Sequence, residues 1–394
     1  MSKEPFSFGK VFLGTPDEPR LGSPKTSFWK SDRTTSLVAA IITVGIGLLA
    51  GLIVLLFVSP QVGLKGFQML VTGGFGTIGV VTGLGRVLYY SVPLIMCGLA
   101  VGFTLRANIF NIGVAGQYML GMTAALFVGI YTEGHLGPFS WLVAICAGAG
   151  AGAIWGCLQG VLQAFLKINA IVCGIMLNYI AVFFANMMME NSREVYIRGR
   201  GWTEMVSDDY VIPRGGFDHL FGKNTTANSG IIICVGLCIL AWWILKKTTL
   251  GYEIKAVGHN AEASRYAGIS TRKATIISMT ISGAFAGLGG AMNHLGASGT
   301  RYLIVDSLPS QGFTGISVAL IAAANPIAII FSGLLIAFFS VGGVSMQGLG
   351  LDPQMVDIIT SVIIYCCAFS MFIRYLIRRQ IKRISKRGEE EQNG

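Results

Sequence analysis

Long uncharged apolar runs alternate with short polar connections along this chain. Two stretches, residues 34–189 and 307–351, are almost free of Asp, Glu, Lys and Arg. The second stretch has none, and the first has only Lys65, Arg86, Arg106, Glu133 and Lys167. Because an apolar run of about 20 residues is long enough to cross a bilayer as a helix, the pattern predicts an all-α polytopic membrane protein.

The apolar pattern predicts about ten transmembrane helices. The segments lie at about 36–58, 87–106, 111–131, 139–165, 170–189, 230–246, 273–296, 309–325, 327–345 and 355–375. The eighth of these is short, which favours a half-helix or a re-entrant element. Residues 62–85 are rich in glycine and are a candidate for a segment lying partly in the membrane interface.

Composition supports a membrane protein. Of the 394 residues, 53% are hydrophobic and 12% are charged, against about 25% charged in soluble domains, and the mean hydropathy is +0.65. The net charge of +10 would suggest nucleic acid in a soluble protein. Here the basic residues gather near the ends of membrane segments, so membrane topology explains them and we predict no nucleic-acid partner.

The distribution of Lys and Arg predicts the orientation. The first 36 residues hold six of them, residues 374–394 hold seven, and residues 246–273 hold six against two acids, whereas residues 190–229 hold five against six acids. By the positive-inside tendency both termini are cytoplasmic. The predicted organisation is therefore a cytoplasmic extension (1–35), a transmembrane domain (36–376) and a cytoplasmic tail (377–394). Within the domain, about 190–229 is an external loop and about 247–272 a cytoplasmic one.

Glycine recurs at every fourth position in one apolar segment, at Gly148, Gly152, Gly156 and Gly160. A weaker version, Gly283, Gly287 and Ala291, runs through the segment at 273–296. This spacing puts a glycine groove along one helix face, against which a neighbouring helix can pack closely. Lining of a pore is the alternative interpretation.

Several kinds of chemistry are not supported by the sequence. The stretch Gly74 to Gly79 matches G-x-G-x-x-G, but no β-α-β pattern surrounds it, and there is no P-loop, so we do not expect this chain to bind ATP. Ionisable groups are nearly absent from the membrane segments, which argues modestly against ion-coupled transport. With no catalytic triad, metal cluster or paired carboxylates, we predict neither an enzyme nor a resident cofactor or metal.

Uncharged polar residues do recur within the membrane segments. Amides and phenols offer donors and acceptors to a neutral solute without the cost of a buried charge. The candidates for the translocation path are Asn111, Gln117, Asn178, Tyr179 and Asn293. For each of them, hydrogen bonding to a neighbouring helix is the alternative.

A short polar segment, "AVGHNAEASRYAGI" (256–269), lies in the predicted cytoplasmic loop. Asn260 is suited to cap the N-terminus of a helix, Glu262 to its first turn, and Gly268 to the position just past its end. We therefore predict an exposed helix of about two turns.

Six motifs in order resemble the permease subunits of ABC importers for simple sugars, nucleosides and branched-chain amino acids. The nucleoside permeases that work with a lipoprotein of the basic membrane protein type are the most similar branch. Two departures from that branch are Ala115, where glutamate is usual, and "ALIAAANP", where glycine often precedes Asn325. The motifs are "GLAVGFTLRANIFNIGVAGQ" (98–117), "NAIVCGIMLNYIA" (169–181), "GYEIKAVGHNAEASRYAGIS" (251–270), "SGAFAGLGGAM" (282–292), "GFTGISVALIAAANP" (312–326) and "DPQMVDIITSVIIY" (352–365).

The resemblance implies one of two homologous permease chains in the cell membrane, working with a cytoplasmic ATPase that binds the ATP and with an external substrate-binding lipoprotein. It also implies that residues around 260–268 form the coupling helix that docks into the ATPase. The contact residues would be Asn260, Glu262, Arg265, Tyr266 and Gly268. The expected solute is a nucleoside or related neutral sugar-containing molecule. A ribose-like sugar, a branched-chain amino acid and, in another class, an ATP-independent transporter are the alternatives.

Overall fold

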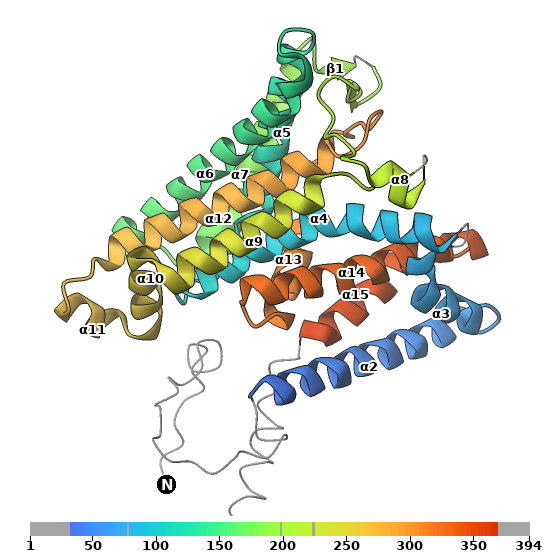
Figure 1. Cartoon of the computed structure of the whole chain (residues 1–394), viewed down its shortest axis with the longest axis horizontal. Coiled ribbons are helices and arrows are strands. Elements are labelled where there is room, and N and C mark those ends of the chain that lie inside the picture. Colours follow the sequence, from blue (N-terminus) through green and yellow to red (C-terminus); the bar gives the residue numbers. More distant parts are fainter. Residues whose placement is uncertain (1–31, 77–78, 198, 223–224, 369–394) are drawn as a thin grey trace, which may run out of the picture.

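The computed structural model describes residues 32–368 except 77–78, 198 and 223–224, and its regular structure is almost entirely helical (Figure 1). The longer helices are α2 (Asp32–Val58), α4 (Val80–Leu105), α5 (Val114–Thr132), α6 (Ser140–Leu166), α7 (Ala170–Asn191), α9 (Gly230–Lys247), α12 (Thr271–His294), α13 (Ser310–Ile321), α14 (Pro326–Met346) and α15 (Pro353–Ala368). The shorter ones are α3 (Gly63–Thr72), α8 (Phe217–Phe221), α10 (Thr249–His259), α11 (Ala261–Tyr266) and the 3₁₀ turns η2 (Gly73–Phe75), η3 (Gly137–Phe139) and η4 (Gln347–Leu349). Strands β1 (Tyr196–Ile197) and β2 (Trp202–Thr203) form one antiparallel hairpin.

Seven helices of the described part are long and apolar enough to cross a membrane, and three further apolar helices are shorter. The seven are α4, α5, α6, α7, α9, α12 and α14, and the shorter apolar pieces belong to α2, α13 and α15. Each predicted apolar segment therefore falls on one helix, which confirms the all-helical polytopic prediction. Residues 1–31 of the predicted extension, 369–376 at the end of the predicted transmembrane domain, and the predicted tail 377–394 lie outside the described residues.

The glycine-rich stretch 62–85 is divided between two helices. Its first part forms α3, and its last six residues begin α4 at Val80, seven residues before the predicted start. The chain can turn back here because Gly83 lies against the backbone of Phe75 and Gly76, where a Cβ would clash. Close backbone contact, which the apolar pattern does not encode, sets this boundary.

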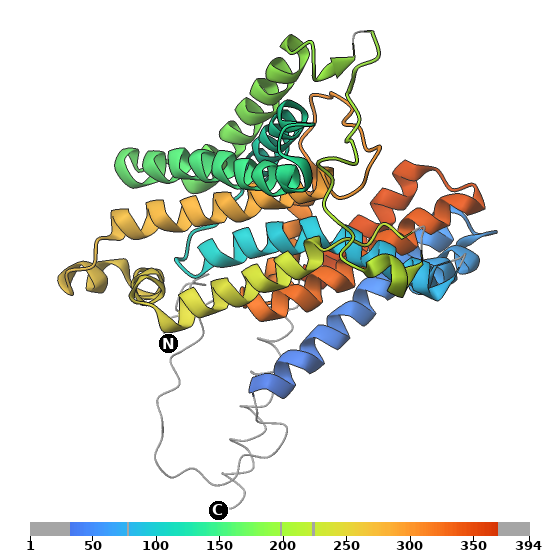
Figure 2. The ribbon, with the colours of Figure 1, turned by 45° about the horizontal axis from the view of Figure 1, so that its top comes forward.

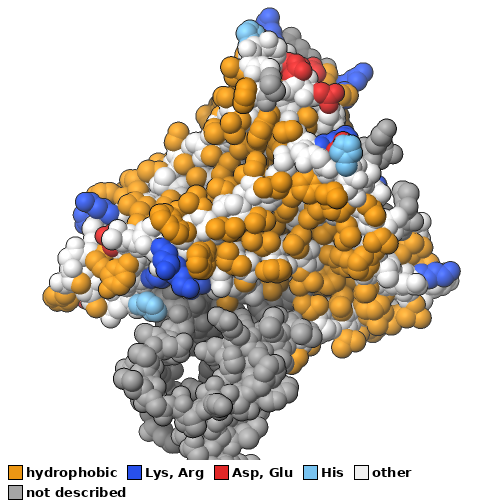
Figure 3. Space-filling model, viewed as in Figure 1, with side chains coloured by type: hydrophobic (Ala, Val, Ile, Leu, Met, Phe, Trp, Pro, Cys, Tyr) orange, Lys and Arg blue, Asp and Glu red, His pale blue; other side chains and the backbone are white. Residues whose placement is uncertain are grey.

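The long helices run between two ends of the molecule (Figures 1 and 2). One end carries α10 and α11, and the opposite end carries the β1–β2 hairpin and α8; we call them the α11 end and the hairpin end. Gly85 lies against Thr225 at the hairpin end, whereas Gly258 of α10 meets Arg106 just after α4. Hydrophobic side chains cover the middle of one face, and charged side chains gather toward its ends, as expected for a membrane-spanning bundle (Figure 3).

The glycines of α6 and α12 form a seam in which the two backbones touch. A Cβ on Gly287 would lie 2.9 Å from the Cα of Gly152, and one on Gly148 would lie 2.7 Å from the Cβ of Ala291. Gly283 likewise faces the backbone of Gly156. The predicted helix-packing role of these glycines is confirmed, because small residues at four-residue spacing let the backbones approach.

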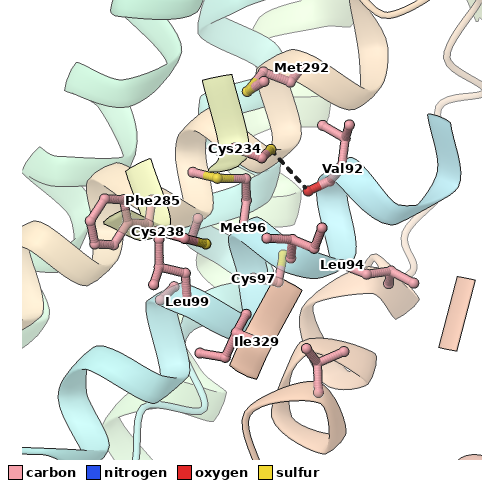
Figure 4. Close-up of a cluster of buried hydrophobic side chains, with 14 of the residues drawn as sticks. Val92, Leu94, Met96, Cys97, Leu99, Cys234, Cys238, Phe285, Met292 and Ile329 are labelled. Atoms are coloured by element: carbon pink, nitrogen blue, oxygen red, sulfur yellow. Dashed lines mark hydrogen bonds between the residues drawn. The ribbon is translucent and has the colours of Figure 1, made fainter. Parts of the chain in front are cut away.

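Helix α4 is the centre of the bundle. Most of it is buried, and it contacts α9, α12, α13 and α14. Its side chains join those of neighbouring helices in an apolar cluster (Figure 4), in which the thiol of Cys234 lies 3.7 Å from the carbonyl oxygen of Val92. Cys97 and Cys238 are buried in the same cluster as free thiols. Packing in this apolar cluster places the neighbouring helices around α4.

Helix α13 is a half-helix. Its 12 residues extend about 18 Å, roughly half the thickness of a bilayer with its headgroups. Gly312 packs on Ala115 and Gly315 packs on Cys97, so α13 begins beside the middle of α4 and ends at the α11 end. The predicted short element at 309–325 is confirmed, and the connection 295–309 must reach into the bundle to meet it.

Candidate functional site

The segment predicted as a short exposed helix is helix α11, with both predicted caps. The Asn260 side-chain oxygen accepts a hydrogen bond from the Ala263 amide at 3.0 Å. At the other end Gly268 has a φ of +82°, and the Ile269 amide donates to the Ser264 carbonyl at 2.9 Å. This Schellman arrangement needs a left-handed residue, which glycine supplies without strain.

Three of the predicted contact residues project from α11 into open space. Tyr266 is 92% exposed, and Glu262 and Arg265 are also exposed. A tyrosine that protrudes so fully from a rigidly capped turn makes almost no contact with its own chain. Glu262, Arg265 and Tyr266 therefore form a compact exposed surface of mixed charge at the α11 end, which we call the α11 knob.

Helix α10 connects this knob to the interior of the bundle. Gly258 lies directly on the Arg106 carbonyl and on the Ala107 backbone, so that a Cβ there would clash. The Arg106 Nε in turn donates to the Ala324 carbonyl at 2.8 Å, and its Nη2 to the Ala323 carbonyl at 3.4 Å. Burial lowers the pKa of Arg106, but a guanidinium remains charged in proteins. Arg106 thus joins the end of α4 to α10 through its backbone and to the end of α13 through its side chain.

The turn that Arg106 holds is strained. Ala323 and Ala324 have φ values of +51° and +55°, in the left-handed region that disfavours residues with a Cβ. They lie in the "ALIAAANP" stretch, in which glycine is often found in the resembling family. The turn closes with a hydrogen bond from the Ala324 amide to the Ala319 carbonyl at 2.9 Å. The strain is opposed by this hydrogen bond and by the charge-assisted bonds from Arg106.

Two of the predicted pore residues, Asn111 and Gln117, belong to a closed ring of buried amides. Asn111 donates to Gln117 at 3.2 Å, Gln117 to Gln159 at 3.0 Å, and Gln159 back to Asn111 at 3.2 Å. Ser282 of α12 accepts a second hydrogen bond from Asn111 at 2.9 Å. All four side chains are fully buried. In this conformation the ring joins α5, α6 and α12 and is closed to solute.

The other predicted residues on α7 differ from each other. Asn178 is fully buried and holds the start of α5: its oxygen accepts from the Gly116 amide at 2.8 Å and its nitrogen donates to the Ile112 carbonyl at 2.9 Å. Tyr179 is 47% exposed, among other exposed apolar side chains of the same helix. The structure does not bring Tyr179 together with the amide ring.

Asn293, the fifth predicted residue, lines a cavity of about 490 Å³ on the hairpin side of α13. The walls come from α4, α5, the last turn of α12, the connection 300–309 and the first turn of α13. The lining residues are Tyr89, Tyr118, Met122, Asn293, His294, Thr300, Arg301, Tyr302, Val305, Ser307, Leu308, Pro309, Ser310 and Gln311. This volume lies in the range of pockets for small molecules.

Three polar atoms on this wall have no hydrogen-bond partner among the described residues. They are the Tyr118 hydroxyl, the His294 Nε2 and the Arg301 Nε; the Asn293 side chain interacts with the Tyr118 hydroxyl without meeting the geometry of a hydrogen bond. By contrast, two other hydroxyls are occupied, because Tyr89 donates to the Asn293 carbonyl at 3.1 Å and Tyr302 to the Met119 sulfur at 3.6 Å. Burial, and then Asp306, raises the pKa of Tyr302 to about 12, so this hydroxyl remains protonated at neutral pH.

The cavity wall at 299–304 is paired with the loop before α8. The Val206 amide donates to the Thr300 carbonyl at 3.0 Å, and the Thr203 amide donates to the Tyr302 carbonyl at 3.0 Å. Arg301 lies between these two bonds, so its backbone is fixed on both sides. A force on the loop 190–229 would therefore reach the cavity directly.

The prediction from sequence missed most of the cavity. Arg301, His294 and Gln311 carry no motif, and only the folded connection places them beside Asn293. One signal was available, since Arg301 is the last basic residue before the uncharged stretch 307–351. Among the described residues, no three His, Cys, Asp or Glu side chains lie close enough together to hold a metal ion.

Residues 83–368 match the family described as the permease component of branched-chain amino acid transport systems. The chain is similar to the guanosine ABC transporter permease NupP of Bacillus subtilis (strain 168), at 34% identity over 89% of this chain and 98% of that protein. It is also 29% identical to the nucleoside ABC transporter permease NupB of Lactococcus lactis (88% and 94% covered) and 30% identical to the glucose ABC transporter permease TsgB13 of Haloferax volcanii (75% and 78%). No solved structure matches.

Proposed function

Because this chain belongs to the family of branched-chain amino acid transport permease components, and so is a multi-pass membrane permease subunit and not an enzyme, we propose that it imports nucleosides. Two relatives that cover most of the chain carry guanosine or nucleoside in their names. The cavity at Asn293 supports a neutral ligand with many hydrogen-bonding groups, since Tyr, Asn, Gln and Ser line it and no Asp or Glu is among its described lining residues. A simple sugar is the second candidate, because a glucose permease is also similar.

The chain works within an ABC system that includes an ATPase and other permease subunits. We propose that α11 docks into that ATPase from the cytoplasmic side, through Glu262, Arg265 and Tyr266. The exposure of these side chains carries the proposal. The caps at Asn260 and Gly268 keep the helix rigid enough to transmit a push, which α10 passes to Arg106 and to α13.

An external lipoprotein that delivers the solute is part of the same proposal. The loop 190–229 lies at the end opposite α11, and its backbone is bonded to the cavity wall at Thr300 and Tyr302. A binding protein seated on this loop would therefore act directly on the cavity. Both chain termini are proposed to be cytoplasmic, on the α11 side.

It stays a prediction that four further residues line the translocation path in a conformation in which that path is open. They are Asn111, Gln117, Asn178 and Tyr179. In the conformation described above, the first three bond within the protein. For Asn293 the cavity supports the prediction, because Asn293 is one of its lining residues.

The proposal is tested by ATP-driven uptake of labelled guanosine into proteoliposomes that hold this chain with its partner permease, ATPase and binding protein. Glu262→Arg is expected to lower both ATPase assembly and uptake, because it reverses a charge at the α11 knob. Glu133→Arg, an exposed charge reversal at the opposite end, is the matched control and should keep both. Normal assembly and uptake in Glu262→Arg would contradict the docking role, and gradient-driven uptake by the chain alone would contradict the ABC assignment.

A further inference from the structure

We propose that the cavity at Asn293 binds a 6-oxopurine nucleoside, such as guanosine or inosine, with Arg301 reading the base and the tyrosines holding it by stacking. The inference rests on the proposed function, and it adds a site and a choice among bases. It follows from four features of the wall, which are its charge, its unpartnered polar atoms, its ring surfaces and the fixed position of Arg301.

The cavity favours a ligand that accepts hydrogen bonds. Arg301 is the one Lys or Arg among its described lining residues, and no carboxylate offsets it there. Ser310 and Gln311 are the first residues of α13, whose N-terminus has no side-chain cap. The free amides at a helix N-terminus add positive potential. Cationic solutes are therefore disfavoured, and a zwitterionic amino acid would find no carboxylate among the described lining residues to pair with its ammonium group.

The unpartnered atoms indicate that something polar completes the wall. A buried donor or acceptor without a partner costs about 1–3 kcal/mol, and three such atoms belong to residues that line this one cavity. Tyr118 is 2% exposed and His294 is 5% exposed, so bulk solvent does not satisfy them. Tyr118 and Arg301 offer donors, and His294 offers either a donor or an acceptor. A nucleoside base presents donors and acceptors on its edges, which can pair with such a set.

The ring surfaces indicate a planar ligand. The hydroxyls of Tyr89 and Tyr302 are already occupied within the protein, so what these residues offer a ligand is aromatic surface. Base-on-aromatic stacking contributes about 1–3 kcal/mol per base. A free sugar has no aromatic face and can offer these rings only its C–H groups, so a base-containing solute gains more from them than ribose or glucose does.

Arg301 selects among bases. A guanidinium has only donors, and it pairs in a bidentate way with the adjacent O6 and N7 acceptors of guanine. Adenine presents an amino donor beside its N7, which would meet Arg301 donor to donor. The two backbone bonds at Thr300 and Tyr302 hold the Arg301 backbone beside the cavity, which keeps its guanidinium within reach of a bound base.

The test is competition against labelled guanosine uptake in proteoliposomes with the full transporter. In the wild type, inosine should compete well, whereas adenosine, uridine, ribose and leucine should compete poorly. Arg301→Gln should lower the preference for guanosine over adenosine by about 10- to 100-fold, and Arg301→Lys should lower it nearly as much because the bidentate fork is lost. Arg193→Gln, an exposed arginine of the neighbouring loop, should leave it unchanged.

Two outcomes separate this inference from the proposed function. If the wild type takes up no nucleoside, the proposed function fails. If it takes up nucleosides but Arg301→Gln and Arg301→Lys retain the wild-type preference, the 6-oxopurine site is overturned. Should Arg301→Gln fail to assemble, direct guanosine binding to the Tyr118→Phe transporter in detergent decides the point, because this change removes only one unpartnered hydroxyl. A several-fold weaker affinity supports the site, and an unchanged affinity contradicts it.

Discussion

Helix α12 meets two very different surroundings along its length. On the face toward α6, Gly283 and Gly287 bring two backbones into contact and leave no room for a methyl group. At its last turn, Asn293 and His294 border a cavity of about 490 Å³ with unpartnered polar atoms. One helix therefore belongs both to a close backbone-to-backbone interface and to a polar cavity.

The difference between the seam and the cavity separates packing from binding. The seam is filled, since each of its glycines lies against a backbone atom of a neighbouring helix. The cavity is incomplete, since its polar atoms need a ligand or water. A change in the seam should therefore act on assembly, whereas a change in the cavity should act on transport while leaving stability nearly intact.

The largest effect is expected in the seam. Gly152→Leu should prevent accumulation of folded protein, because the Cβ of the new side chain would lie 2.8 Å from the Cα of Gly287. Overpacking of this kind lowers the free energy of unfolding by about 1–3 kcal/mol or more. Gly150→Leu is the matched control on the same helix, where a Cβ meets nothing within 4 Å. Expression and thermal stability in detergent measure the difference. Equal stability of the two variants would contradict the seam.

A smaller effect is expected when the amide ring is compared with the cavity. Gln159→Leu leaves Gln117 without its acceptor and Asn111 without one of its donors, which should lower the free energy of unfolding by about 1–3 kcal/mol. Tyr118→Phe removes a hydroxyl that has no partner among the described residues, so its melting temperature should stay the same or rise. Thermal unfolding of both variants checks this, and a loss of stability in Tyr118→Phe as large as in Gln159→Leu would show that the cavity is a packing site.

The smallest effect concerns the turn that Arg106 holds. Ala323→Gly should raise the free energy of unfolding by about 1 kcal/mol, because glycine adopts the left-handed conformation without the Cβ penalty. Ala322→Gly is the neighbouring control, with a φ of −73°, and should be neutral or slightly destabilising. Melting temperatures of the two variants test the sign. A decrease for Ala323→Gly would mean that the left-handed conformation is not the one adopted in the assembled transporter.

The helical elements could be predicted because hydrophobic length and local capping are properties of short stretches of sequence. Residues 139–165 were predicted as an apolar helix, and Ser140–Leu166 forms α6. Asn260 and Gly268 marked the ends of α11 by their side-chain chemistry alone. The predicted start of α4 was wrong, because the actual start depends on the contact of Gly83 with a turn that lies several residues earlier in the chain.

The candidate sites could be predicted only in part. Asn111, Gln117 and Asn293 were selected for the same reason, that each is a polar residue in an apolar segment. The structure separates them, because the first two find partners on α6 and α12 whereas Asn293 faces a cavity. Whether a side-chain amide forms its hydrogen bonds within the protein or borders a cavity depends on residues far away in sequence, such as Gln159 and Arg301.

The sequence by itself determined that this is a helical membrane permease, where its helices lie, that α6 and α12 carry glycine faces, and that a capped helix stands at residues 261–266. These properties depend on interactions within about four residues. Tertiary structure alone decided which polar groups are satisfied, which turn Arg106 holds, and that a loop between α12 and α13 brings Arg301 to the cavity that Tyr118 also lines. The physical reason is that hydrogen bonds and cavities join residues more than 100 positions apart, and no local pattern records such distances.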